Sequence, residues 1–184
     1  MKKLFVVLLA LCLFVMPAMA QTKDEPEAIN WEDLEKDFNE TGYGYEFYDI
    51  SEHGFKIMIP NGLEPTELSQ KDIENGFVRY FATEDQSVRV LISYRNLGCE
   101  TLADLEELIT ENVKNASIAG YYVINGLDAL IFLNPADEDL TAAIGTTEPG
   151  YFIQVSLEPV ISNEEINKLS GFIFGSIQPL TEEE

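Results

Sequence analysis

The sequence predicts an α+β fold, in which an antiparallel β-sheet is flanked by helices as an α/β sandwich, over a single domain at residues 43–180. Apolar and polar side chains alternate from 88 to 95, which is the period of a strand. A helical spacing of apolar residues follows Thr101, and strand alternation returns over 120–157 with turn signals between the runs. Hairpin-linked strands on both sides of a helix are typical of this class.

Residues 1–20 are predicted to be a signal peptide. Lys2 and Lys3 precede an apolar run at 4–15, and Ala18-Met19-Ala20 is a small-residue cleavage site. A membrane anchor is the alternative, but the run is shorter than the ~20 residues that span a bilayer. We therefore expect export to the bacterial periplasm or the medium, with no transmembrane segment in the mature chain. Cys99 is then the one remaining cysteine, so no intramolecular disulfide can form.

Residues 21–42 are predicted to be an acidic leader with a short helix. The polar stretch 21–29 contains Pro26 and indicates a flexible segment. Asn30 can cap a helix in which Trp31, Leu34 and Phe38 form one apolar edge. This edge is expected to lie on the domain, and binding to a partner is the alternative. The end of the chain, 181–184, is an acidic tail.

Strand pairs account for most of the predicted sheet. The expected hairpins join 43–50 to 55–60, 77–82 to 88–95, and 121–124 to 127–133. The last has Asn125-Gly126 between its strands, which suits a type I′ turn. Further strands are expected at 140–146 and 151–157, which makes about eight strands in total. Tyr43, Tyr45, Phe47 and Tyr48 crowd the first strand, so that strand is either buried on both faces or lines an exposed groove.

Two further helices begin with capping boxes. Thr101 with Asp104 starts a helix that carries an apolar stripe and should end near Asn115. Ser162 with Glu165 is expected to start the last helix, which should end at 175–177.

The charge and the chemistry-bearing residues narrow the function classes. The formal net charge of −22 argues against nucleic acid and anionic lipid as partners. The single histidine, His53, lies in a predicted turn, and no nucleophile elbow, phosphate loop or dinucleotide motif is present. We expect a protein without catalytic residues. The alternative is a hydrolase that uses a pair of carboxylates, for which so acidic a chain offers many candidates.

A loop at 134–139 gathers oxygen ligands of the kind that calcium, magnesium or manganese prefers. Its candidate metal ligands are Asn134, Asp137 and Asp139, with Glu138 beside them. The spacing does not match an EF-hand, because the loop lacks that motif's glycine and terminal glutamate. A solvated acidic loop is therefore the competing interpretation, and no cofactor is otherwise predicted.

All three arginines, Arg79, Arg89 and Arg95, lie in one predicted hairpin of this acidic chain. If Ala82 pairs with Val88, Arg79 lies diagonal to Arg89 and the side chains form a basic spot that could accept an anion. A shift of one residue would put Arg79 on the opposite face. The alternative is that each arginine pairs with an acid on the protein's own surface.

The order of elements resembles the PsbP-like α/β family. The resemblance rests on a strand ending in Ile59-Pro60, a leucine-rich central helix, the turn at Ile124-Asn125-Gly126, and a last helix closing on Phe172–Ile177. That family includes an extrinsic photosystem protein, a eukaryotic factor that binds the Ran GTPase, and small exported bacterial proteins. The resemblance implies a sheet between helices and a role in binding other proteins, and it places no functional residue here.

The sequence therefore predicts an exported bacterial binding domain whose partner is a protein or an envelope component. A calcium- or manganese-binding accessory protein is the first alternative, and a hydrolase is the second.

Overall fold

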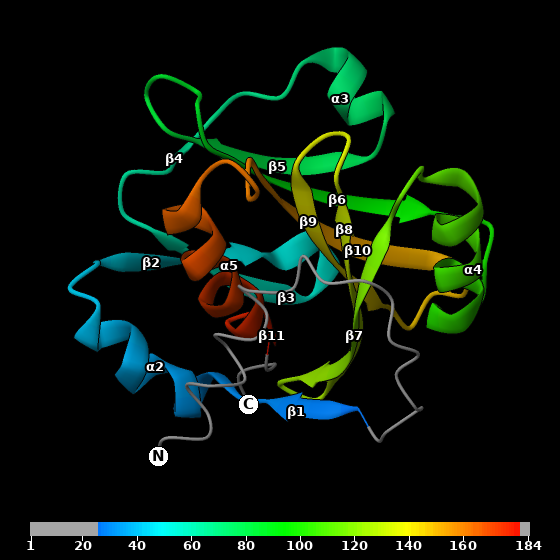
Figure 1. Ribbon diagram of the computed structural model, residues 1–184, viewed down its shortest axis with the longest axis horizontal. Helices are drawn as coiled ribbons and strands as arrows, with labels where there is room; N and C mark the ends of the chain where they lie inside the picture. Colours follow the sequence, from blue (N-terminus) through cyan, green and yellow to red (C-terminus); the bar gives the residue numbers. More distant parts are fainter. Residues whose placement is uncertain (1–25, 181–184) are drawn as a thin grey trace.

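The computed structural model describes residues 26–180, which form an α+β fold with two β-sheets (Figure 1). The larger sheet has the strand order β1-β7-β8-β9-β10-β6-β5-β4 and the smaller sheet has the order β11-β3-β2. The strands of the larger sheet are β1 (Glu27–Ile29), β4 (Glu64–Pro65), β5 (Phe77–Ala82), β6 (Arg89–Asn96), β7 (Ser117–Ile124), β8 (Leu127–Asn134), β9 (Asp139–Gly145) and β10 (Tyr151–Glu158). The strands of the smaller sheet are β2 (Tyr45–Ile50), β3 (Phe55–Pro60) and β11 (Gln178–Pro179). The helices are α2 (Trp31–Glu40), α3 (Gln70–Glu74), α4 (Leu102–Asn112) and α5 (Glu164–Gly175), with a 3-10 turn η1 at Ser51–His53. The predicted fold class is confirmed.

The three predicted hairpins are all present. The pairs β2/β3, β5/β6 and β7/β8 are antiparallel, and β9 and β10 extend the sheet in the same sense. Asn125 and Gly126 have φ values of 47° and 84°, as a type I′ turn requires. Strand β7 begins at Ser117, earlier than predicted, and has a register shift between Ile118 and Gly120.

The larger sheet has two faces with different coverings. The side of the larger sheet that carries Val90 and Val155 is named the inner face. These side chains belong to one apolar cluster together with α2, α5 and the smaller sheet. We call outer face the opposite side, where Leu105 and Ile109 of α4 pack on Leu130. Because opposed residues on paired strands share a face, the register assigns every other strand residue to one side or the other.

The prediction of a flexible segment at 21–29 is wrong for residues 27–29. Strand β1 pairs in parallel with β7, joining Ala28 to Val123, so this part of the chain is a strand and not a flexible segment. The predicted helix α2 is confirmed, and Trp31, Leu34 and Phe38 are buried in the inner cluster. Its apolar edge therefore packs on the chain's own core. Asn30 is the N-cap residue, but its side chain makes no capping hydrogen bond.

The capping box at Thr101 and Asp104 is confirmed by both of its hydrogen bonds, and α4 ends at Asn112. The box predicted at Ser162 and Glu165 is wrong. The N-cap is Asn163, whose side chain accepts hydrogen bonds from the backbone N–H groups of Glu165 and Ile166. Ser162 instead donates through its backbone N–H and its hydroxyl to the Glu138 carboxylate.

Besides β1, three short elements were not predicted. Helix α3 begins at a capping box formed by Ser69 and Asp72, while β4 and β11 are two residues long. The predicted signal peptide (1–20) and acidic tail (181–184) lie outside the described residues. Among residues 26–180, no helix has both the length and the hydropathy needed to cross a bilayer.

Candidate functional site

The structure does not bring the three arginines together. Strand β5 pairs Ala82 with Arg89 and Arg79 with Ile92, which is the register that separates Arg79 from the other two. Arg79 therefore projects from the inner face near η1, where its guanidinium contacts Glu52 at 2.7 Å. Its Nη1 also donates to the Val78 carbonyl at 2.7 Å. Both partners of Arg79 therefore belong to the chain itself.

Arg89 lies on the outer face and is also paired. Its Nε lies 2.8 Å from the Glu158 carboxylate, which is directly opposite on β10. Burial raises the pKa of Glu158, and the positive charge of Arg89 opposes that shift. Arg89 and Arg95 share a face, but they are six positions apart along β6, which is a distance of roughly 20 Å. The predicted single basic patch is therefore not formed.

Arg95 has a different environment from the other two arginines. Its guanidinium lies over the Phe77 ring, 5.4 Å from the centroid, and its Nη2 donates to Gln154 Oε1 at 2.6 Å. Ser93, which is buried, also lies within hydrogen-bond distance of Gln154 Oε1 at 3.4 Å. Phe77, Ser93 and Gln154 are directly opposed on β5, β6 and β10, so one row of the sheet supports the guanidinium.

The positive charge of Arg95 is not neutralised by the described part of the chain. The ion pairs found within residues 26–180 involve Arg79, Arg89 and Lys168, and none involves Arg95. Its Nε is buried without a hydrogen-bond partner. Burial lowers the pKa of Arg95 from its usual value, because the charged form has lost part of its hydration.

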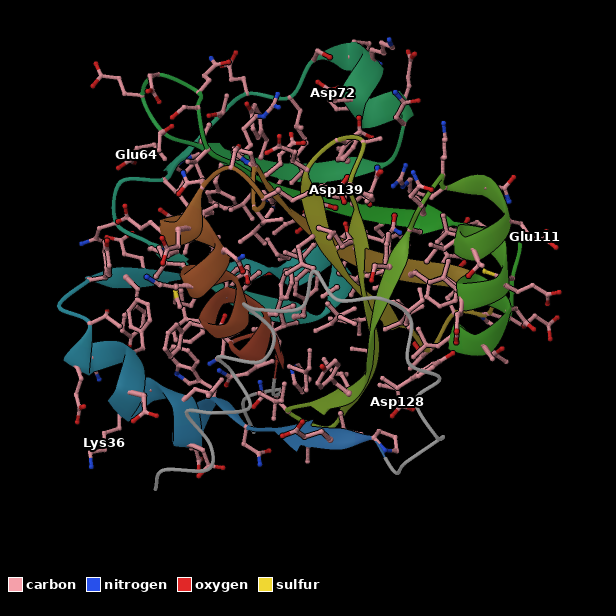
Figure 2. The ribbon with its side chains drawn as sticks, viewed as in Figure 1. Lys36, Glu64, Asp72, Glu111, Asp128 and Asp139 are labelled. Carbon is pink, nitrogen blue, oxygen red and sulfur yellow. The ribbon has the colours of Figure 1, made fainter. Side chains whose placement is uncertain are left out.

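The proposed metal ligands do lie together at the β8–β9 turn. The Asn134 amide donates to Asp137 at 2.7 Å and to Asp139 at 3.4 Å. In Figure 2, Asp139 is labelled close to the loop that joins β8 to β9. Within the described range, no three acidic, histidine or cysteine side chains are arranged to hold a metal ion. The calcium or manganese hypothesis therefore stays a prediction.

Asp139 is a carboxylic acid whose pKa lies well above its usual value. Burial raises its pKa to about 6 from 3.8, the negative charges of Glu158 and Asp137 add to the rise, and hydrogen bonds from Thr141 and Asn134 oppose it. The folded state therefore holds this proton more tightly than the unfolded state does. The resulting stabilisation is complete below about pH 4 and is lost as the pH rises through 6.

Replacement of Asp139 by Asn is expected to raise stability above pH 6 and to change it little below pH 4. A shift of about two pKa units corresponds to at most about 3 kcal/mol, which partial solvent exposure reduces to on the order of 1 kcal/mol. Urea unfolding of wild type and Asp139→Asn at several pH values measures the difference. The exposed Asp128→Asn, whose carboxylate does not act on Asp139, serves as the matched control. A difference that does not vary with pH would contradict this assignment.

His53 packs on Tyr94, whereas Cys99 packs against the apolar cluster under α4. His53 belongs to η1, as the predicted turn position implied, and its ring stacks on Tyr94 with 4.1 Å between centroids. Burial lowers the pKa of His53. Cys99 is partly buried, and burial raises the pKa of its thiol, which disfavours the reactive thiolate.

Sequence reasoning identified Arg95 but not the residues around it. Phe77, Ser93 and Gln154 come from three strands, and only the register places them in one row. The alternation pattern identified the strands and could not supply this pairing.

A scan against protein-family models gives no match for this chain. A search of the curated proteins also finds no significant match.

Proposed function

We propose that this chain is an exported, non-enzymatic binding domain that receives an acidic group of a protein or envelope component at Arg95. The observation that carries the proposal is the half-buried Arg95 guanidinium, which has a buried Nε without a partner and no carboxylate beside it in residues 26–180. In a chain with 33 acidic residues, an arginine left without an acid is unexpected unless another molecule supplies one.

The energetics favour an anion as the ligand. A charge that is partly removed from water without a counter-charge costs free energy, which a bound carboxylate would recover. Arginine binds carboxylates through two parallel N–H groups. Such binding requires the Arg95 side chain to turn outward, and this rotation also releases the buried Nε–H to the ligand. Phe77 and Gln154 remain beneath as a floor.

The wider assignment rests on sequence. Export is proposed from the N-terminal pattern at 1–20, and the PsbP-like resemblance implies protein binding. The raised pKa of the Cys99 thiol and the turn position of His53 support a role without nucleophilic catalysis. The cation-binding alternative has its own test, which is the melting temperature with calcium or manganese against chelator at fixed ionic strength. A selective rise that Asp139→Asn abolishes would favour it.

The three arginines allow a direct test by NMR. Three Arg Nε–H signals are expected, and each is assigned by an Arg→Lys variant. Titration with acetate, succinate and phosphate at fixed ionic strength should shift the Arg95 signal saturably. The signals of Arg79 and Arg89 should move much less, because both are already ion-paired. Parallel movement of all three signals, or no movement, would overturn the site.

Partner capture extends this test to the natural ligand. Arg95→Gln removes the charge and keeps a polar side chain, and it is expected to leave the melting temperature unchanged or higher, because an unpaired buried charge is removed. Capture of a partner from envelope extracts should be lost in Arg95→Gln and retained in the control Arg89→Gln. Equal capture by both variants would show that Arg95 does not bind that partner.

A further inference from the structure

Strand β2 is a free edge of the smaller sheet. In the order β11-β3-β2 it pairs with β3 along six residues, without a register shift. Proteins usually protect such edges with proline, a bulge or charged side chains, especially lysine. The sequence of β2, YEFYDI, contains neither proline nor lysine, and its charged residues are Glu46 and Asp49. Figure 1 shows β2 at the outer side of the molecule, next to β3.

The register shows which backbone groups of β2 point outward. Tyr45 lies opposite Pro60, which has no N–H, so these two residues cannot exchange a pair of hydrogen bonds. The preceding pair confirms the phase, because the Asn61 N–H donates to the Gly44 carbonyl at 2.9 Å. Inward and outward groups alternate along an antiparallel strand. The backbone N–H and C=O groups of Tyr45, Phe47 and Asp49 therefore point away from β3.

The outward N–H and C=O groups of β2 can bond to an added strand, and aromatic packing holds β2 in place. Within residues 26–180, no backbone hydrogen bond from another segment reaches Tyr45, Phe47 or Asp49. The rings of Tyr45 and Phe47 each pack against Trp31 at 5.7 Å between centroids. An added strand would consequently meet a preformed edge and would not have to order it first.

The exposed side chains of β2 are acidic. Glu46 and Asp49 are exposed, and Glu35 of α2 accepts a hydrogen bond from the Tyr45 hydroxyl. Lys56 is a nearby cation and lies over the Phe47 ring on the β3 side. An open hollow of about 400 Å³ is lined by Tyr43, just before β2, and by Glu164, Glu165 and Lys168, the last of which pairs with Glu164 at 2.8 Å. The exposed carboxylates of β2 therefore complement a positively charged ligand, and the hollow, which already holds a cation, does not add to that selection.

We propose that β2 receives an extended, lysine- or arginine-bearing segment of another protein as an additional strand. The outward backbone groups supply the ladder hydrogen bonds, and Glu46 and Asp49 select the charge. A second copy of this chain fits less well, because each copy carries a net charge of −22. The surface is separate from Arg95, so either site can fail without the other.

Hydrogen exchange on the full chain tests the edge directly. In the free protein, the amides of Tyr45, Phe47 and Asp49 should exchange faster than those of Glu46 and Tyr48, which face β3. The probe is an eight-residue peptide that alternates lysine with valine. Its addition should protect the three outward amides, and a peptide with glutamate in place of lysine should bind at least about tenfold more weakly. Protection without dependence on peptide charge would overturn the choice of ligand.

A matched pair of variants separates the backbone from the charge. Asp49→Pro removes an outward N–H without removing a bond to β3, while Asp49→Ala removes only the carboxylate. The lysine peptide should bind Asp49→Pro about tenfold or more weakly than Asp49→Ala. Equal binding to the two variants would overturn strand addition. If Asp49→Pro does not fold, the exchange pattern of the wild type decides alone.

Two other ligands of the β2 edge would give different results in the exchange experiment. Dimerisation seen by sedimentation, with protection of the outward amides in the absence of peptide, would assign the edge to a second copy. Protection in the free chain that disappears when residues 1–25 or 181–184 are removed would assign it to the chain's own ends. Either result overturns the proposal.

Discussion

Replacement of Asn125 by alanine is expected to lower the free energy of unfolding by about 3 kcal/mol. The side chain joins the β7–β8 turn to two distant segments of the chain. Its Oδ1 accepts from the Trp31 N–H at 2.7 Å, and its Nδ2 donates to the carbonyls of Gly175 and Ile177 at 2.8 and 2.7 Å. Alanine leaves these three groups without their partner and also places a methyl side chain at a positive φ of 47°.

Two control variants separate the contributions at this position. Asn125→Gly keeps the positive φ and loses the hydrogen bonds, so it should be about 1 kcal/mol less destabilising than Asn125→Ala. Asn125→Asp keeps an acceptor for Trp31 but turns a carboxylate toward the two carbonyls, so it should destabilise at least as much as alanine. Urea unfolding measures all three. A loss below about 0.5 kcal/mol in Asn125→Ala would show that these bonds do not hold the segments together.

Replacement of Phe38 by alanine is expected to cost about 3–5 kcal/mol, which is the range for deleting a buried aromatic ring. Phe38 has 0% exposure, and its ring lies 5.3 Å from Tyr45 and 5.3 Å from Phe172 between centroids. The cavity would open between α2, β2 and α5. The midpoint of urea unfolding reports this loss.

The controls for Phe38 test whether α2 is part of the core. Phe38→Leu keeps most of the volume and should cost about 1–2 kcal/mol. Ile73→Ala at a side chain that is 53% exposed should change the free energy of unfolding by less than about 0.5 kcal/mol. If Phe38→Ala were as mild as Ile73→Ala, α2 would be a detachable leader and not a layer of the domain.

Strands and helices were predictable where the pattern is local. The alternation over 88–95 and the Asn125-Gly126 turn depend on neighbouring residues, and both are confirmed. The capping box at Thr101 also depends on residues three positions apart. The prediction at Ser162 failed because Glu138, 24 residues away, binds that serine, and a local motif does not register such a competitor.

From the sequence, the candidate site could be predicted only as an arginine in a strand, without the residues that surround it. Whether Arg79 joins Arg89 depends on a single-residue step in the pairing of β5 with β6, and the turn at 83–87 does not specify that step without the packing of the inner face. The partners of Arg95 come from β5 and β10, so its lack of a counter-charge is visible only after the sheet is assembled.

The sequence by itself determined the fold class, the three hairpins, the helices α2 and α4 and the acidic charge, because periodicity, turn chemistry and composition act over a few residues. The tertiary structure alone decided that β1 joins the sheet, that Asn125 connects α2 to α5, and that Arg79 and Arg95 lie on opposite faces. These features depend on register and on long-range contacts. Both are selected by the burial of a whole face of side chains and not by any one segment.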